Sequence, residues 1–202
     1  MADKPIILNA PMIRALLDGR KTQTRLIHKE YRDYSASALL PDGTARPICT
    51  RFAPGNRLWV REAFRGDADY DNYAPSEWSH WPVHYEADGP PDTRRGLGSD
   101  GKKRPSIHMP RWASRLTLIV TDVRVQRLQD ISGADAVAEG GPSSHPSIDR
   151  VSREFGAKDF PRSWFEQTWN SIHGPCAWDD NPWVVALSFD VHRCNIDQMG
   201  PN

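Results

Sequence analysis

The sequence predicts a mixed α+β fold, with a small β-barrel, helices at the barrel rim and long loop insertions. Strand-like segments that alternate apolar and polar residues are scattered along the chain rather than gathered at one end. One helical pattern lies near the start, and another directly precedes the final strand. The 17 prolines and 14 glycines favour many loops and turns over a helical bundle. Together these three observations are typical of a small mixed barrel.

Length and charge limit the possible classes of protein. A chain of 202 residues can bury one sizeable core, so we expect a single domain over residues 1–202. The 26 basic and 26 acidic side chains cancel, so no net field attracts long nucleic acid or an anionic membrane. Binding to such a partner would need a local patch.

Cysteine spacing and hydropathy indicate the compartment. Cys49, Cys176 and Cys194 are odd in number and widely spaced, and none has the spacing of a zinc ligand. We therefore expect free thiols, no metal and no cofactor. No segment approaches 18 consecutive apolar residues, and no signal-like run opens the chain. The sequence thus predicts a cytoplasmic protein with no membrane partner.

The first expected elements are a short helix and a strand. An apolar run at 5–8 leads into residues 10–17, where apolar side chains recur at helical spacing. Pro11 suits the first turn of this helix, and Gly19 suits its C-terminal stop. Residues 21–27 then alternate as a strand does.

Two central strands are expected next. Residues 57–64 place Leu58 and Val60 on one face. Residues 114–128 carry the strongest strand pattern in the chain, which fits one bent strand or two. Periodicity is lost between these segments, and we expect loop insertions at about 29–56, 66–110 and 141–158.

The last part of the chain predicts two helices and a strand. Ser132 and Asp135 have the spacing of a capping pattern for a short helix over 133–139. Residues 161–172 form an amphipathic pattern of helical period. Residues 182–191 read as a buried closing strand.

Several blocks of this sequence resemble the ASCH family of the PUA-like superfamily. The segment PMIRALLDGRKTQTR at 11–25 is similar to the ASCH signature, in which a helix ends in Gly and a Lys and a Thr open a strand. Further blocks resemble the longer form found in phages and prophages: PGNRLWVREAF at 54–64, RPSIHMPRWASRLTL at 104–118, LQDIS and AEG within 128–140, and HGP and NPWV within 169–184. The resemblance implies an ASCH-type, PUA-like mixed β-barrel.

The resemblance also implies an activity. The best understood relatives are similar to N4-acetylcytidine amidohydrolase, which removes an acyl group from the exocyclic amine of cytidine. These enzymes use a Lys, a Thr three residues later, and a Glu at the end of a short helix. Lys21, Thr24 and Glu139 occupy the matching positions. One position departs from the pattern, because Arg25 follows Thr24 directly where the enzyme has an intervening apolar residue.

These residue types suit amide hydrolysis, which needs a nucleophile, a base and an acid for the leaving amine. Thr24 can attack or position a water, and a partly desolvated Lys21 can act as the base. Glu139 can hold Lys21 or relay a proton. In a regular strand Lys21 and Thr24 point to opposite faces, so they converge only if Lys21 lies in the turn before the strand.

Ordinary structural roles also account for the same three residues. A Lys after a helix favours the helix dipole, a Thr favours strands, and a Glu at a helix end usually faces solvent. Glu139, however, stands at the C-terminal end of its helix, which is unfavourable for a carboxylate. This position hints at a separate use.

A second cluster of candidates precedes the long strand. His108, Arg111, Trp112 and Arg115 combine an aromatic ring with basic groups, as readers of single-stranded RNA do. Alternatively, Trp112 plugs the barrel end and the arginines pair with acids. The remaining candidates for binding substrate or RNA are Arg20, Arg25, Arg61 and Glu62.

Three functions remain open from the sequence. The leading hypothesis is an amidohydrolase acting on an N4-acylated cytidine or a similar modified nucleoside. The alternatives are a non-catalytic module that binds RNA or a modified base, and a metal-independent ribonuclease in which Lys21 and Arg25 stabilise phosphorane charge. The expected partner is a modified nucleoside or single-stranded RNA, with no obligate protein partner.

Overall fold

The computed structural model describes residues 3–27, 51–78, 82–90, 101–143, 150, 154 and 160–200. The chain forms two compact units. Unit 1 comprises Met1–Gly19, Gly55–Val120 and Asp190–Asn202, and unit 2 comprises Arg20–Pro54 and Thr121–Phe189. The chain passes between them at four points, and two of these lie within the long strands β6 (Thr117–Arg127) and β7 (Trp183–His192). The single ASCH-type domain expected over 1–202 stays a prediction.

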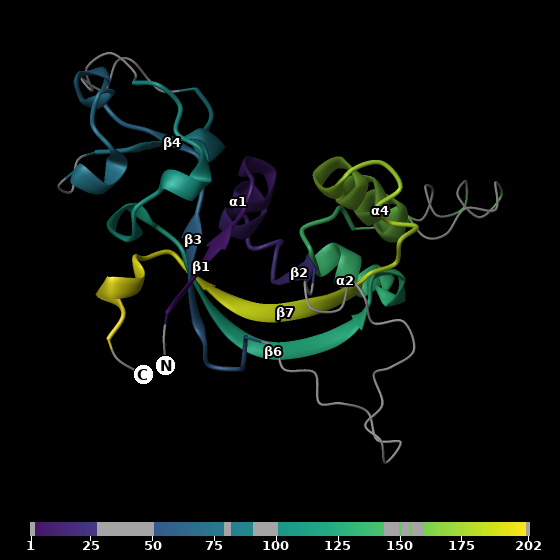
Figure 1. Cartoon of the computed structure of the whole chain (residues 1–202). Helices are drawn as coiled ribbons and strands as arrows, with labels where there is room; N and C mark the ends of the chain where they lie inside the picture. Colours follow the sequence, from purple (N-terminus) through teal and green to yellow (C-terminus); the bar gives the residue numbers. More distant parts are fainter. Residues whose placement is uncertain are drawn as a thin grey trace, which may run out of the picture. The chain divides into compact units, whose positions relative to one another are not determined.

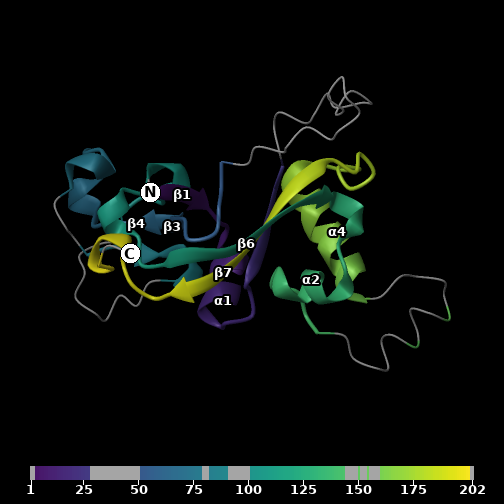
Figure 2. The same ribbon diagram turned by 90° about the horizontal axis from the view of Figure 1, so that it is seen from below.

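The main sheet has five strands in the order β1-β3-β6-β7-β2. In unit 1, β1 (Lys4–Ile7) pairs in parallel with β3 (Arg57–Arg61), and β3 pairs antiparallel with β6. In unit 2, β2 (Gln23–Ile27) pairs antiparallel with β7. A second sheet joins β4 (Phe64–Arg65) to β5 (His84–Tyr85). Figure 2 shows β6 and β7 running side by side.

The α+β class predicted from the sequence is confirmed, but the closed barrel is not found. Closure requires the first and last strands of the sheet to pair with each other. Among the described residues, β1 pairs with β3 and β2 pairs with β7, which leaves these two strands as the edges of an open sheet. Alternation along each strand predicts which face is buried, but it carries no information on which strands pair.

Unit 1 begins with the predicted helix, α1 (Ala10–Leu17). The side chain of Asn9 caps this helix by accepting a hydrogen bond from the Met12 N–H, and Pro11 lies in the first turn. The predicted insertion at 66–110 contains β5 and several short 3-10 turns, and β4 lies directly before it. Those of unit 1 are η2 (Ala68–Tyr70), η3 (Pro75–Glu77), η4 (Glu86–Asp88), η6 (Ser106–His108), η7 (Arg111–Ala113) and η9 (Ile196–Gln198).

A separate apolar cluster holds these turns of unit 1 together. Phe64, Trp78, Met109 and Ala113 are its buried members, and the rings of Phe64 and Trp78 meet edge to face. Gly66 is required here, because a Cβ at this position would lie 2.5 Å from the Trp78 ring. The part of the insertion that the structure describes is therefore packed rather than open loop.

Unit 2 places two helices on the same side of β7, as Figure 1 shows. These are α2 (Gly133–Ala138) and α4 (Phe160–His173), and the turn η8 (Leu128–Asp130) precedes α2. Ser132 and Asp135 form the predicted capping box of α2. The predicted helices at 133–139 and 161–172 and the closing strand at 182–191 are thus confirmed to within a residue or two.

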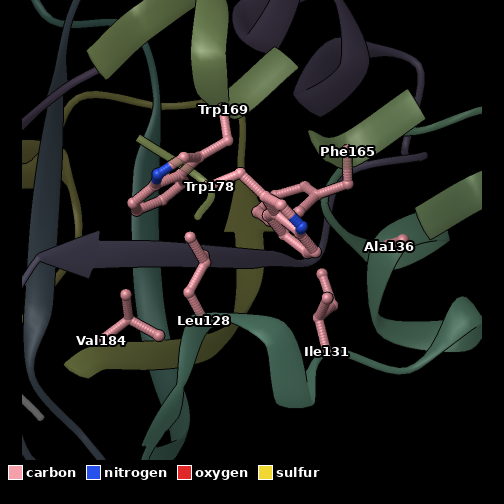
Figure 3. Packing of buried hydrophobic residues seen from close by; sticks show 7 residues of the cluster. All are labelled: Leu128, Ile131, Ala136, Phe165, Trp169, Trp178 and Val184. Carbon is pink, nitrogen blue, oxygen red and sulfur yellow. The ribbon is translucent and has the colours of Figure 1, made fainter. Parts of the chain in front are cut away.

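The core of unit 2 is aromatic. Figure 3 shows the rings of Phe165, Trp169 and Trp178 facing Leu128 and Ile131. Phe165 and Trp169 come from α4, so the amphipathic pattern of this helix buries the face that the sequence predicts. The packing joins α4 to η8 and to the strands beneath it.

Three further expectations concern the rest of the chain. The predicted insertions at 29–56 and 141–158 lie mostly outside the described residues. Cys176 and Cys194 are free thiols, whereas Cys49 lies outside the described residues. In the described part of the chain, no helix combines the length and the apolar character that a membrane span needs.

Candidate functional site

A short backbone ladder in unit 2 brings the start of β2 to the end of α2. Lys21 and Glu139 form an isolated antiparallel bridge, and the Thr22 N–H donates to the Ala138 carbonyl at 2.8 Å. The Thr22 carbonyl in turn accepts from the Phe189 N–H of β7 at 3.0 Å. Lys21 therefore lies just before the regular strand, and its neighbour across the bridge is 118 positions away in sequence.

Lys21 is held as a fully bonded ammonium group. Its side chain has no exposed surface, and its Nζ donates to Glu139 Oε2 at 2.8 Å. The same Nζ donates to the Gln23 carbonyl at 2.8 Å and to the Glu139 carbonyl at 2.9 Å. An ammonium group has three donors and no acceptor, so every donor of Lys21 is used. In this arrangement Lys21 acts as a cation and has no lone pair with which to serve as a base.

Glu139 joins two buried cations. One carboxylate oxygen accepts from Lys21, and the other accepts from Arg25 Nη1 at 2.9 Å. Both cationic side chains are fully buried, and that of Glu139 is only 4% exposed. Buried charges of this kind are tolerated in a low-dielectric interior only when they compensate one another. We refer to Lys21, Arg25 and Glu139 as the ionic cluster.

Arg25 has more donors than the cluster has acceptors. Its Nη1 also donates to Gln23 Oε1 at 2.6 Å. Its Nη2 lies 3.3 Å from Asp135 Oδ2, and in the part of the chain that the structure describes neither Nη2 nor the buried Nε makes a hydrogen bond. The guanidinium group also lies over the Phe165 ring, with Cζ 5.7 Å from the ring centroid. A buried donor without an acceptor is costly, so this feature needs a cause.

Asp135 forms the outer edge of the ionic cluster. Its Oδ1 accepts from Arg124 Nη2 at 2.9 Å. Burial alone would raise the pKa of Asp135, but the hydrogen bond from Arg124 and the charge of Arg25 outweigh it and lower the pKa to about 2. Asp135 is thus ionised throughout the neutral range, and it connects the buried cations to the solvent-facing Arg124.

Thr24 is buried, but it does not join the cluster. It lies opposite Leu187 in the sheet, whereas its neighbours Gln23 and Arg25 lie opposite Ser188 and Ala186. Successive strand residues face opposite sides, so the Thr24 side chain points away from those of Gln23 and Arg25. Among the described residues, the Thr24 hydroxyl makes no hydrogen bond to either Lys21 or Glu139.

Two residues of this site were not singled out from the sequence. Gln23 accepts from Lys21 through its carbonyl and from Arg25 through its side chain, and its amide donates to Ser188 Oγ at 3.2 Å. The sequence offered one signal for Gln23, because the period-2 pattern of a strand places it on the same face as Arg25. Asp135 was recognised as a helix cap, and nothing local to it indicates its second contact with Arg25.

Most of the other predicted binding residues are engaged by protein groups. Arg20 is exposed and donates to the Gly140 carbonyl at 2.8 Å. In unit 1, Arg115 forms paired hydrogen bonds with both Glu62 and Asp88, at 2.8 to 2.9 Å. Burial raises the pKa of Glu62, while the hydrogen bonds from Arg115 oppose this effect. These contacts occupy the guanidinium group of Arg115 with carboxylates rather than leaving it to bind a phosphate.

The cluster around Trp112 is likewise committed to the protein. Arg111 donates to Asp197 and to Asp3, and these hydrogen bonds raise its pKa. Trp112 is half-buried and packs against the apolar cluster of unit 1, while His108 is exposed. The arginines thus pair with acids, which is the alternative that the sequence left open. Arg61 differs from them, because its guanidinium group meets no carboxylate among the described residues.

No protein-family model matches the chain, and neither the curated proteins nor the solved structures include a match to it. Within the residues that the structure describes, no group of three His, Cys, Asp or Glu side chains is arranged to hold a metal ion. The chemistry of the site is therefore argued from its own contacts.

Proposed function

We propose that this protein is an amidohydrolase that removes the acyl group from an N4-acylated cytidine or a similar modified nucleoside, with the ionic cluster as its centre. One observation carries the proposal: the buried Arg25 has two donor nitrogens, Nε and Nη2, that make no hydrogen bond. An acyl oxygen or a cytosine carbonyl supplies the acceptor that these donors lack. This excess of donors supports an oxygen-bearing substrate as the missing acceptor.

The cost of the ionic cluster also supports a functional role. Replacing a buried ion pair with packed apolar residues is often neutral or stabilising, so stability alone seldom explains one. Here two cations and a carboxylate are almost completely removed from water, in a unit that already has a large aromatic core. Groups of this kind concentrate at functional sites.

The geometry suggests roles that differ from those expected from the sequence. Hydrolysis breaks the amide C–N bond, transfers a water-derived oxygen to the acyl carbon and returns a proton to the N4 amine. Lys21 and Arg25 are suited to stabilise the oxyanion that develops on the acyl oxygen. Glu139 holds both cations in place. The attacking group is water, because Thr24 points away from the ionic cluster. Glu139 takes the proton that this water loses and passes it to the leaving N4 amine. Because Lys21 is fully covered, substrate reaches the cluster only after part of its cover moves.

The proposal includes the finer fold assignment, an ASCH-type member of the PUA-like superfamily. The mixed α+β sheet and the meeting of Lys21 with Glu139 agree with what the resemblance implies. The open sheet edges at β1 and β2 do not.

The test is to incubate the purified protein with N4-acetylcytidine and to follow the release of cytidine by chromatography. We expect turnover that is lost in Arg25→Lys, because an ammonium group cannot reproduce the Nε and Nη2 donors. Glu77→Gln changes an exposed carboxylate in unit 1 and serves as the control with full activity. No cytidine release at high concentration of folded protein would overturn the proposal.

A second candidate is a non-catalytic module that binds RNA or a modified base. It is favoured by the complete bonding of Lys21 and by the separation of Thr24 from the cluster. Saturable binding of N4-acetylcytidine without turnover, measured by calorimetry, would select this function over the first.

A further inference from the structure

Arg25 differs from Arg57 and Arg115 in which side of its guanidinium group is occupied. One edge of a guanidinium group is formed by Nε and Nη2, whose N–H bonds point in nearly the same direction and suit two oxygens of one planar anion. We propose that this edge of Arg25 is a binding site for a small carboxylate anion such as acetate. We refer to Nε and Nη2 of Arg25 as the open edge.

Two other arginines of the chain show what this edge binds. Arg57 donates from Nε and Nη2 to the two oxygens of Asp3, each at 2.8 Å. Arg115 donates in the same way to the two oxygens of Glu62, each at 2.9 Å. The open edge of Arg25 is buried, yet it makes no hydrogen bond to any residue that the structure describes. The edge that holds a carboxylate twice in unit 1 therefore lacks one in unit 2.

The contacts of Arg25 hold the open edge in one orientation. Its Nη1 donates to Glu139 Oε1 at 2.9 Å and to Gln23 Oε1 at 2.6 Å, so both hydrogens of Nη1 are used. The Phe165 ring lies over the guanidinium group, with Cζ 5.7 Å from the ring centroid. A ligand that uses both donors of the open edge must lie in the plane of the guanidinium group, and the ring over that plane favours a flat ligand.

Charge favours an anion with a single negative charge. Lys21 and Arg25 are fully buried cations, and Glu139 is the buried carboxylate that they share. One positive charge among these three groups is therefore without a buried counter-charge. Asp135 supplies only part of it, because its Oδ1 is bonded to Arg124 and its Oδ2 accepts no hydrogen bond from Arg25. A carboxylate supplies the charge and both oxygens, whereas a phosphate dianion brings one negative charge too many.

The inference rests on the proposed function for the source of this anion. Hydrolysis joins the oxygen of water to the acyl carbon, and the acid so formed is ionised at neutral pH. The acyl oxygen of the substrate offers the open edge one acceptor, whereas the released carboxylate offers two. We therefore expect the product to compete with the substrate, so that acetate raises the KM for N4-acetylcytidine and leaves kcat unchanged.

The binding test needs no nucleoside. The purified protein is titrated with sodium acetate in a calorimeter, in a buffer without carboxylates and at an ionic strength held constant with sodium chloride. We expect saturable binding of acetate, and binding of acetamide and of inorganic phosphate that is weaker by roughly tenfold or more, because acetamide has one oxygen and no charge and phosphate is neither planar nor a monoanion. No binding of acetate, or equal affinity for acetamide or phosphate, would overturn the inference.

A pair of identical substitutions tests the open edge itself. Arg25→Lys is expected to weaken acetate binding roughly tenfold, because an ammonium group has no pair of parallel donors. Arg57→Lys makes the same change where the edge is already occupied by Asp3, and it is expected to leave the affinity for acetate unchanged. Equal losses in the two variants would place the acetate somewhere other than the open edge.

Asp135→Asn tests the charge argument and keeps Arg25 in place. This change removes a negative charge that lies 3.3 Å from Nη2, so we expect acetate to bind about threefold more tightly. Damage to the fold would weaken binding instead, and circular dichroism verifies that the variant is folded. Unchanged or weaker binding by the folded variant would contradict a carboxylate site at the open edge.

Binding and turnover together separate this inference from the proposed function. Acetate binding that Arg25→Lys weakens, in a protein that releases no cytidine, would support the carboxylate site and overturn the amidohydrolase. Release of cytidine that acetate does not inhibit would support the amidohydrolase and overturn the carboxylate site.

Discussion

Each unit buries a glutamate against arginine, and the two arrangements differ in one respect. In unit 1, Arg115 bonds both oxygens of Glu62 and both oxygens of Asp88, and its guanidinium group lies 3.9 Å from the Tyr85 ring centroid. In unit 2, Glu139 is shared between Lys21 and Arg25, and Arg25 keeps donors with no acceptor. A buried carboxylate is therefore not by itself a sign of function, and the proposal for unit 2 depends instead on the Arg25 donors that lack an acceptor.

The difference also has a consequence for stability. A complete network such as that of Glu62 ties η4 to β3 and β6, because Asp88 ends η4 while Glu62 and Arg115 lie beside these strands. Each buried donor left without an acceptor costs about 1–3 kcal/mol. The ionic cluster of unit 2 thus contributes less to folding stability than it would if every donor of Arg25 had an acceptor. Four experiments test this comparison.

The largest expected effect is that of Glu139→Ala. This change leaves two buried cations without their shared carboxylate, and removal of one partner from a buried ion pair destabilises by about 3–5 kcal/mol. Urea unfolding measures the loss. A loss below about 1 kcal/mol would show that water already reaches Lys21 and Arg25, and the ionic cluster would no longer count as buried.

The matching change in unit 1, Glu62→Ala, is expected to cost less. Arg115 retains its paired hydrogen bonds to the more exposed Asp88, so its charge stays compensated. We expect a loss of about 1–3 kcal/mol in the same urea measurement. If Glu62→Ala were as damaging as Glu139→Ala, the contrast between a shared and a doubly supported ion pair would disappear.

Acid should affect the two networks in opposite directions. The folded-state pKa of Asp135 is lowered from 3.8 to about 2, so its contribution is present above the unfolded value and is lost as the pH falls through the folded one. Allowing for solvent screening, we expect about 1–2 kcal/mol of stability to vanish between pH 4 and pH 2, and Asp135→Asn to remove this dependence.

Burial raises the pKa of Glu62, so its contribution is fully present below the unfolded pKa and is lost as the pH rises through the folded value. Thermal unfolding from about pH 2 up to neutral pH, with Glu62→Gln alongside, separates the two signs, because the Asp135 loss lies below pH 3.8 and the Glu62 loss lies above pH 4.5.

The smallest effect is expected for Arg111→Ala. Its partner Asp197 is mostly exposed, and Arg111 itself is partly exposed, so this pair is screened by water. Its second partner, Asp3, keeps its paired hydrogen bonds to Arg57 when Arg111 is removed. We expect a loss below about 1 kcal/mol, which added salt should reduce further. A loss as large as that of Glu62→Ala would mean that exposure does not separate strong from weak ion pairs in unit 1.

Much of the local structure follows from patterns in the sequence. The helices α1 and α4 follow from apolar residues at helical spacing, and α2 follows from the capping pair Ser132 and Asp135. The buried faces of β3 and β7 follow from alternation or from a continuous apolar run. The prediction of a closed barrel was wrong for a related reason, since these patterns describe single strands and not how the strands pair.

The site was predictable only in part. A family resemblance placed Lys21 and Glu139 in one site, and the structure brings them together. The same reasoning gave no basis for including Gln23, and it left the pairing of Arg111 and Arg115 with carboxylates as an open alternative. The pairing of the two arginines depends on residues far away in sequence, such as Glu62, which is 53 positions from Arg115, and Asp3, which is 108 positions from Arg111.

The sequence by itself determined which segments are helices and strands and which side chains share a face, because these features depend on residues only a few positions apart. The strand face shared by Gln23 and Arg25 is of this kind. Only the tertiary structure decided that Glu139 lies between Lys21 and Arg25, and that Arg61 pairs with no carboxylate among the described residues. The physical reason is that an ion pair requires two charged groups within a few ångströms, and strand pairing, rather than local preference, sets that distance.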